Sequence, residues 1–490
     1  MSIRLSEDTV RQLPEAVIRP GYDRTTATAG IVHLGVGAFH RAHQAVYIDD
    51  CLAAGETQWG IIAASLRSTD TRDALLPQDG LYTLAVRDSQ KEELRIVGAI
   101  LDIRVAPEDP AALVTAMADP AIRIVTLTVT EKAYLRKANG SLDIDHPDIQ
   151  ADLADPLRPR TIYGFILAAL VRRRDAGLLP FTVLSCDNLP ANGKTLQRLL
   201  TEFAARCSTE LAAYVADELS CPCSMVDRIV PATTHQDRSR IAGGIGMQDA
   251  WPVVSEPFRQ WVIEDRFPQG RPDWQRFGVT MVDDVAPFEI MKLRLLNGAH
   301  SAIAYLGQLV GLQTVADAFA APAVRDFVDG LWSELIPTLP ENAGLAPQDY
   351  IRSLTARFSN TALRHMTSQI ANDGSQKLPQ RIVEAALERL AVHAPVDHLS
   401  FVIAAWIAAL RARRTDVAFS DPLDPQLTAI DLGLSDTTAT VDAVFTITGF
   451  AAGAGEQREL ARLVEHHLMA ILTTGPQQAL AHLNTRGMTK

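Results

Sequence analysis

Three polar residues near the middle of the chain have the types and the spacing that proton transfer requires. Lys292, Asn297 and His300 follow Pro287, and apolar residues recur at helical spacing over Met291–Ala299. On a regular α-helix the three side chains fall within an arc of about 140°. An ammonium, an amide and an imidazole would then face one cleft, as the removal of an alcohol proton requires. A surface lysine, a capping asparagine and a packed histidine are the structural alternative.

A second candidate site lies near the N-terminus, where a short apolar strand is followed by two glycines. The expected strand is Ile31–Leu34, the glycines are Gly35 and Gly37, and a helix is expected over Ala42–Ala53. This order is typical of a dinucleotide site, because glycines let the backbone approach a pyrophosphate and a helix N-terminus supplies N–H donors. His40 stands where a third glycine is usual, so a plain tight turn is the alternative.

An acidic residue after the next strand would fit the ribose of such a dinucleotide. Trp59–Leu66 reads as a second apolar strand, and Asp70 follows shortly after it. A carboxylate at this place can hold the ribose hydroxyls of NAD. Arg67 beside it could instead receive the extra phosphate of NADP. We therefore expect NAD, with NADP left open.

Polar residues also follow the later strands, where ligands of open α/β sheets bind. Thr130 and Glu131 come at the end of the clearest buried strand, which begins at Arg123. Asn188 follows another strand and could donate a hydrogen bond to a developing oxyanion, with an Asx turn as the alternative. Asp227 and Arg228 end a further strand, and such an Asp–Arg pair is more often structural than catalytic.

The composition fits a globular enzyme. The chain has 490 residues, 47% of them hydrophobic, which is enough for two or three domains. A net charge of −12 opposes nonspecific binding of nucleic acid. The five cysteines form no C-x-x-C motif, the N-terminus has no signal pattern, and the longest apolar run, Phe401–Leu410, is too short to span a bilayer. We expect a cytoplasmic protein that binds neither nucleic acid nor membrane.

One acidic segment could be taken for a metal site. Residues 141–155 contain five aspartates and His146. Pro147 and Pro156 interrupt the segment, so we expect an exposed loop there and no metal.

The order of the predicted elements indicates an α/β fold with two domains. Strands end near Asp284, and helical patterns dominate from Pro287 onward. We predict a Rossmann-type dinucleotide-binding domain over residues 1–285 and a mainly α-helical domain over residues 286–490. Pockets prefer domain interfaces, so the substrate is expected in a cleft between the two. Lys377, in a polar turn, either directs a cation into that cleft or is solvated.

These segments together resemble the long-chain mannitol dehydrogenase family, which includes mannitol 2-dehydrogenase and fructuronate reductase. The resemblance covers the chain from about residue 30 to beyond residue 380. The matching segments are Gly35–Gln44, Thr128–Glu131, Ser185–Asn188, Met225–Arg228, Glu256–Phe258, Met291–His300 and Asp373–Ser375.

The resemblance implies a secondary-alcohol dehydrogenase that uses NAD or NADP and no metal. By the same resemblance Lys292 is the general base, Asn188 and Asn297 hold the reacting oxygen, and His300 positions the substrate. Glu289 is implied in proton passage to solvent, and Asp227 and Lys377 in contacts with the substrate. The predicted cofactor-binding residues are Gly35, Gly37, Phe39, His40, Arg41, Asp70, Thr130 and Glu131.

The substrate subgroup is not decided by these motifs. Mannitol 2-dehydrogenases resemble one another in having an arginine four residues before the Asp-Gly-Ser turn, where this chain has Gln369, as fructuronate reductases do. Met366 and Ser368, however, stand where the fructuronate type carries an arginine and a tryptophan. A uronate would need a cation, for which Arg364 and Lys377 are the nearby candidates. We favour a mannitol/fructose-type polyol and ketose pair, with D-mannonate and D-fructuronate as the alternative. A non-catalytic NAD-binding regulator and a scaffold protein remain as other classes, and the oligomeric state is not predicted.

Overall fold

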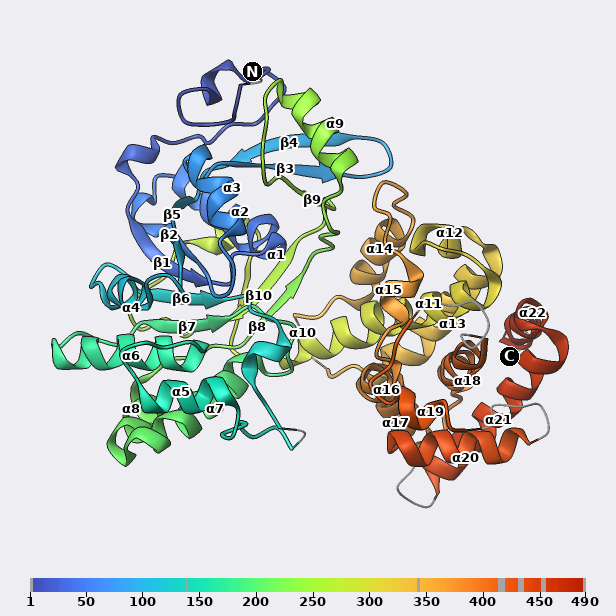
Figure 1. Cartoon of the computed structure of the whole chain (residues 1–490). Coiled ribbons are helices and arrows are strands. Elements are labelled where there is room, and N and C mark those ends of the chain that lie inside the picture. Colours follow the sequence, from blue (N-terminus) through green and yellow to red (C-terminus); the bar gives the residue numbers. More distant parts are fainter. Residues whose placement is uncertain are drawn as a thin grey trace. The chain divides into compact units, whose positions relative to one another are not determined.

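The computed structural model describes residues 3–137, 139–341, 344–412, 419–430, 436–450 and 455–487. The chain divides into two compact units, Met1–Ala286 and Pro287–Lys490. The described strands all belong to the first unit, and the second is built from helices (Figure 1). The predicted α/β class, with a Rossmann-type domain followed by a helical domain, is confirmed.

A parallel sheet organises the first unit, with the strand order β5-β2-β1-β6-β7. Its strands are β1 (Ala29–Leu34), β2 (Gly60–Ser65), β5 (Ile100–Val105), β6 (Ile124–Leu127) and β7 (Thr182–Ser185). Each neighbouring pair is parallel. The strand order reverses between β1 and β6, and ligands of open α/β sheets bind at the carboxyl ends of the strands at such a switch point.

The two faces of this sheet are covered by different elements because side chains alternate along each strand. Val32 and Leu34 pack with one set of helices, whereas Ile31 packs with another. The first set comprises α4 (Pro110–Ala118), α6 (Ile162–Asp175), α7 (Asn192–Cys207) and α8 (Thr209–Glu218). On the second face lie α1 (Ala38–Ala42) and α2 (Gln44–Ala53), together with the side chains of Trp261 and Trp274.

Two smaller sheets complete the first unit. Within residues 81–105, β3 (Tyr82–Arg87) pairs antiparallel with β4 (Glu92–Val97) to form a hairpin. The remaining strands are β8 (Ser224–Asp227), β9 (Val253–Ser255), β10 (Gln260–Glu264) and β11 (Thr280–Val282), in the orders β4-β3-β9 and β11-β10-β8. The same region also holds β5, which pairs with β2 in the parallel sheet instead of extending the hairpin.

Two local expectations in the first unit are wrong. The helix expected over Ala42–Ala53 begins earlier, at Ala38, and is interrupted at His43 (φ −125°, ψ −84°). His43 Nε2 is bonded to the Gln260 carbonyl at 2.9 Å, which anchors the ring where the backbone leaves helical geometry. Residues 147–154, expected in an exposed loop, form α5 (Pro147–Ala154). Proline at the first helical position starts a helix there rather than interrupting one.

The second unit packs around α11 (Ala299–Val310), which contacts α12, α13, α15 and α18. Its α-helices are α12 (Val315–Ala320), α13 (Pro322–Leu335), α14 (Pro347–Phe358), α15 (Thr367–Ala371), α16 (Gly374–Leu378), α17 (Glu384–Ala391), α18 (Asp397–Ala412), α19 (Asp424–Leu427), α20 (Thr437–Thr448), α21 (Glu456–Thr474) and α22 (Pro476–Gly487). The stretch around Lys292–His300, expected as a regular α-helix, consists of α10 (Ala286–Met291), a π-helix over Lys292–Gly298, and α11. A second π-helix spans Pro379–Val383.

None of the helices in the described ranges is long and apolar enough to cross a membrane.

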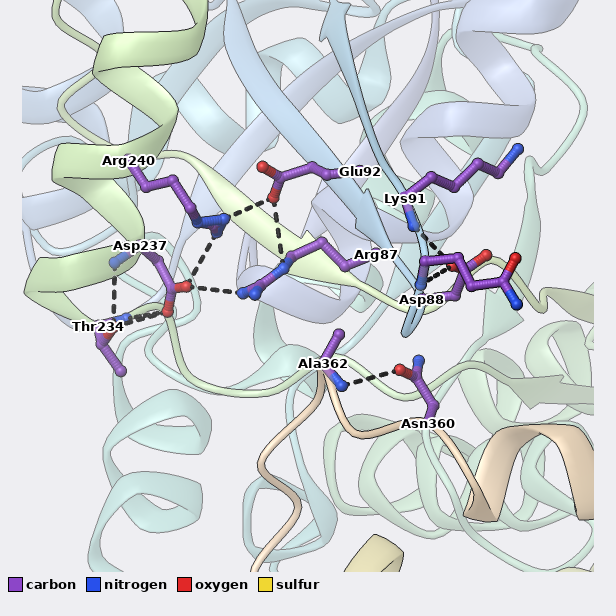
Figure 2. A network of polar contacts seen from close by, with 10 residues as sticks. Arg87, Asp88, Lys91, Glu92, Thr234, Asp237, Arg240, Asn360 and Ala362 are labelled. Carbon is purple, nitrogen blue, oxygen red and sulfur yellow. Dashed lines mark hydrogen bonds and ion pairs between the residues drawn. The ribbon is translucent and has the colours of Figure 1, made fainter.

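A polar network joins α9 (His235–Ile245) to the β3–β4 hairpin (Figure 2). Asp237 closes a capping box with Thr234 and lies 3.1 Å from Arg87 and 3.0 Å from Arg240. Glu92 contacts the same two arginines from β4, at 3.4 and 2.7 Å. Burial opposes ionisation of Asp237, but hydrogen bonds from Thr234 and the two arginines outweigh it and hold its pKa below the ordinary value. One carboxylate therefore caps a helix and bridges two elements.

We expect Asp237→Ala to lower the free energy of unfolding at pH 7 by about 1–3 kcal/mol, because the cap and both ion pairs are lost. Because the folded pKa is depressed, this stabilisation is present above the ordinary aspartate pKa and lost as the pH falls through the folded value. Urea unfolding at pH 7 and near pH 3 measures both effects. Asp237→Asn, which keeps the shape of the side chain but not its charge, should lose part of this stabilisation. An unchanged midpoint at pH 7 would contradict the assigned role.

Candidate functional site

The first glycine of the turn after β1 lies in direct contact with the loop after β6. Gly35 has φ +93°, and its N–H donates to the Ala64 carbonyl at 2.9 Å. A Cβ on Gly35 would lie 2.2 Å from the Thr128 carbonyl oxygen, closer than real Cβ atoms approach. The Thr128 hydroxyl also donates to the Gly35 carbonyl at 2.7 Å. Glycine is therefore required here by both backbone angle and space.

The second glycine leaves space of a different kind. Gly37 caps α1 with φ −82°, an angle open to any residue, and it is exposed. A Cβ built on Gly37 would meet nothing nearer than the Gly35 carbonyl at 3.9 Å. The surface above this turn is thus open down to the backbone, as the approach of a phosphate requires.

Two histidines stack beneath the turn. His33 on β1 and His40 on α1 have ring centroids 3.4 Å apart at 14°. His33 is bonded to Thr126 and Thr128 at 2.7 and 2.9 Å, whereas neither ring nitrogen of His40 has a hydrogen-bond partner within the described residues. Burial lowers the pKa of His33 to about 3 and that of His40 well below its ordinary value. Both rings are neutral at pH 7, and His40, 1% exposed, supports the turn from below.

Two neighbours of His40 are also packed inward. The Arg41 guanidinium is buried, donates to the Trp251 carbonyl and lies 5.3 Å from the centroid of Tyr82. Burial lowers the pKa of Arg41 to about 10. Phe39 is half-buried and stacks on His43 at 5.1 Å. These contacts fix the shape of the turn, and cofactor contacts by Phe39, His40 and Arg41 stay a prediction.

A cavity of about 430 Å³ lies at the carboxyl ends of β2 and β5. It is lined after β2 by Leu66 and Arg67 and after β5 by Ala106 and Pro107, with further residues from the segments after β6 and α5. Asp70 is exposed in the first turn of α3 (Asp70–Leu75), just beyond this strand end. The strand order places this cavity beside the glycine turn, on the β2 side of β1.

The ends of β6 and β7 are tied together by an aspartate that the sequence analysis did not single out. Asp187 accepts hydrogen bonds from the backbone N–H groups of Val129 and Thr130, each at 2.9 Å. It directly precedes Asn188, which is exposed at the end of β7, and Thr130 precedes Glu131, which is also exposed. The signal available in the sequence was an acidic residue directly after a predicted strand. The sequence could not show which backbone groups this residue would bind.

Asp227 is the last residue of β8 and is 4% exposed. Its neighbour Arg228 is buried and donates to the carbonyls of Ala42 and Glu256. Arg228 thus holds the break between α1 and α2, which makes it a structural residue, as expected for this pair. A substrate contact by Asp227 stays a prediction.

In the second unit the π-helix changes the expected geometry of the proton-transfer residues. Hydrogen bonds in a π-helix join residues five apart, so Asn297 follows Lys292 by about one turn. The arc of about 140°, which assumed a regular α-helix, is wrong for this segment. The wider turn brings the amide and the ammonium nearer to the same side, and both side chains are half-buried.

His300 lies one residue into α11 and is buried among aromatic rings. Its ring centroid is 4.9 Å from Phe358 and 5.2 Å from His365. Burial, aided by nearby charges that include Arg357, Arg381 and Lys292, lowers the pKa of His300 well below its ordinary value. The imidazole is therefore neutral at pH 7, and its Nε2 has no hydrogen-bond partner in the described part of the chain.

A guanidinium outside the predicted set also approaches these residues. Arg381, in the second π-helix, lies 3.1 Å from the Ser301 hydroxyl and 3.4 Å from the Asn297 carbonyl. Gly298 lets the two π-helices approach, since a Cβ there would lie 3.3 Å from the Arg381 carbonyl. Arg381 thus contacts Asn297 and the residue after His300, and both Arg381 and Lys292 act electrostatically on His300.

The other two predicted residues of the second unit, Glu289 and Lys377, differ in setting. Glu289 is half-buried on α10, one turn before Lys292. Lys377 on α16 donates to the Asn372 carbonyl at 2.7 Å and lies 3.7 Å from Asp373. Among the residues that the structure describes, no group of three or more His, Cys, Asp or Glu side chains is placed to hold a metal ion.

Comparison with known proteins places both units in one family. The mannitol dehydrogenase Rossmann domain matches residues 29–276, and the mannitol dehydrogenase C-terminal domain matches residues 284–472. The mannitol 2-dehydrogenase of Cereibacter sphaeroides is 44% identical over 422 residues, which are 85% of this chain and 88% of that protein. The D-mannonate oxidoreductase of Escherichia coli K12 is 42% identical over 84% of this chain and 86% of its own length.

A solved structure agrees with these sequence matches. The Pseudomonas fluorescens mannitol 2-dehydrogenase, in a ternary complex with NAD and D-mannitol, has a TM-score of 0.85 and 37% identity. The match covers 98% of this chain and 99% of that one. The resemblance seen in the motifs is confirmed, as is the expectation of an oxidoreductase. The chain belongs to the mannitol dehydrogenase family.

Proposed function

We propose that this protein is an NAD-dependent secondary-alcohol dehydrogenase that interconverts a sugar alcohol and its ketose. The observation that carries the proposal is the placement of Lys292 and Asn297 about one π-helical turn apart, with His300 following on α11 within the electrostatic reach of Lys292. The mannitol 2-dehydrogenases among the relatives, one of them in complex with NAD and D-mannitol, support it. Each chemical requirement of alcohol oxidation has a candidate group in this set.

The first requirement is a base, because hydride leaves carbon only as the hydroxyl loses its proton. Lys292, half-buried at the start of the π-helix, takes this proton. Glu289, one turn earlier on α10, passes the proton on to solvent.

The second requirement is a set of donors for the oxygen as it becomes alkoxide-like. The Asn297 amide lies about one turn after Lys292 and supplies one donor. Asn188, exposed at the end of β7, is proposed for the same task. The neutral His300 has an Nε2 without a protein partner in the described residues, which suits a hydrogen bond to a substrate hydroxyl. Asp227 and Lys377 are proposed to bind the remaining hydroxyls.

The residues around the glycine turn fit a dinucleotide. The open surface at Gly37 accommodates a pyrophosphate, and the cavity after β2 and β5 has room for an adenosine. When bound, the nicotinamide accepts the hydride. Thr130 and Glu131, after β6, lie at the switch point where such cofactors bind. Asp70 favours the two ribose hydroxyls of NAD, while Arg67 in the cavity wall keeps NADP as the second candidate.

The second candidate function is the oxidation of a sugar acid. The 42% identity to a D-mannonate oxidoreductase favours it. A carboxylate substrate needs a cation, and the Lys377 ammonium already donates to a backbone carbonyl and lies near Asp373. Arg364 is exposed at its place before α15. Since neither forms a dedicated carboxylate site by itself, the neutral polyol is preferred.

Alanine at the two glycines should separate folding from cofactor binding. Gly35→Ala is expected to lower the free energy of unfolding by ~2 kcal/mol or more, because the methyl group meets the Thr128 carbonyl and the backbone is left-handed. Gly37→Ala should leave the melting temperature unchanged and weaken NADH binding roughly tenfold, because the methyl group occupies the open turn. Thermal unfolding and NADH fluorescence titration measure the two. Unchanged NADH affinity in Gly37→Ala would remove the turn from the cofactor site.

Loss of the base should abolish turnover without unfolding the protein. Lys292→Ala is expected to reduce kcat at neutral pH by about 10²–10⁴-fold, the range for a positioned acid or base. Lys194→Ala, which removes an exposed lysine on α7, serves as the control and should keep full activity. Activity and NADH binding are measured for both variants. Full activity in Lys292→Ala would overturn the assigned base.

A substrate panel tests the proposed function and its alternative together. We expect NAD-dependent oxidation of at least one of mannitol, arabinitol and sorbitol, with kcat/KM at least about tenfold above mannonate and altronate. NAD should be preferred to NADP, and Asp70→Ala should reduce that preference. Preference for an acid would favour the second candidate function. Tight NADH binding without turnover on any of the five would point to a regulator.

A further inference from the structure

The loop after β6 contains a residue in a costly backbone conformation. Thr130 has φ 71° and ψ 155°, a region that glycine alone occupies readily. Thr130 is also β-branched, which makes the strain larger than for most side chains. A residue held this way is strained and persists only where its surroundings impose the conformation. The loop must therefore be clamped from outside.

The clamp is the carboxylate of Asp187. Its Oδ1 accepts the N–H groups of Val129 and Thr130, both at 2.9 Å, and its Oδ2 accepts the Tyr134 hydroxyl at 2.9 Å. Asp187 is 8% exposed and Tyr134 fully buried, so the bonds form away from solvent, where charge-assisted bonds are strong. The Tyr134 hydroxyl is also bonded to the Ser185 hydroxyl at 2.6 Å, which fixes the clamp to β7.

A second buried aspartate shows what is particular to this arrangement. Asp249 accepts the N–H groups of Thr83 at 2.5 Å and Trp251 at 2.9 Å, and the Gln78 amide at 3.0 Å. Neither Thr83 nor Trp251 has a positive φ. Asp249 thus matches Asp187 in burial and in bonds, but it holds no strained residue.

We propose that Asp187 is a positioning residue that holds Thr130 in its strained conformation and so gives the β6 loop the shape that binds the dinucleotide. The inference rests on the proposed function, according to which a dinucleotide binds at this edge of the sheet. It adds that the carboxylate of Asp187 is what maintains the strained backbone conformation of Thr130. Without the carboxylate, Thr130 relaxes and the loop moves away from the switch point.

A double-mutant cycle with NADH as the probe tests this. Asp187→Asn should weaken NADH binding roughly tenfold or more in the wild-type background, because the amide cannot accept all three donors. In the Thr130→Gly background the same change should cost at most about threefold, since glycine adopts this conformation without a clamp. Asp249→Asn is the matched control and should have the same effect in both backgrounds. Equal losses for Asp187→Asn in both backgrounds would overturn the proposal.

Hydrogen exchange reports on the clamp independently of the cofactor. The amides of Val129 and Thr130 should exchange at least about tenfold faster in Asp187→Asn than in the wild type, and unchanged protection would also overturn the proposal. If NADH does not bind the wild-type protein, the proposed function fails while this measurement still decides the clamp. If Asp187→Asn does not fold, Tyr134→Phe replaces it in the cycle and should show a smaller effect of the same sign.

Discussion

The close approach of Gly35 to the Thr128 carbonyl is the contact on which the first unit's candidate site depends. With no Cβ at Gly35, the turn after β1 can lie against the loop after β6, and the Thr128 hydroxyl bonds the two together. The β6 loop is in turn held by Asp187 at the end of β7. Three strand ends are thereby joined at the switch point of the sheet, where the open surface of Gly37 lies. Any side chain at Gly35 would push the turn after β1 away from the loop after β6 and so disturb the contacts that join the three strand ends.

A corresponding constraint in the second unit is the π-helix over Lys292–Gly298. A π-turn packs less well than an α-turn, so other groups must support its backbone. The Leu295 carbonyl accepts the Trp332 indole N–H at 2.9 Å, and Arg381 lies 3.4 Å from the Asn297 carbonyl. Gly298 allows the second π-helix to approach closely enough for the arginine contact. The irregular turn that places Lys292 and Asn297 is therefore stabilised by side chains far away in the sequence.

Buried, neutral histidines are common to both candidate sites. His33 and His40 stack face to face beneath the glycine turn, and two adjacent charged rings could not be tolerated there. His300 lies among Phe358, His365 and nearby cations, all of which favour its neutral form. Desolvation thus sets the protonation state in each place. A neutral ring can accept or donate a hydrogen bond, and this suits His300 for contact with an uncharged hydroxyl.

The sequence by itself determined the fold class, the family and the strand ends at which polar residues would gather, because strand periodicity, glycine pairs and local motifs are short-range features. Gly35, Asp70, Thr130 and Asn188 could be placed at sheet ends in this way. Only the tertiary structure decided the π-helix, the break at His43, the helix begun by Pro147 and the clamp of Asp187 on Thr130. Each of these depends on partners tens to hundreds of residues away or on a local choice that competing propensities leave open. A 3.6-residue period read from Met291 onward cannot reveal one extra residue in a turn, since distant side chains make that turn stable.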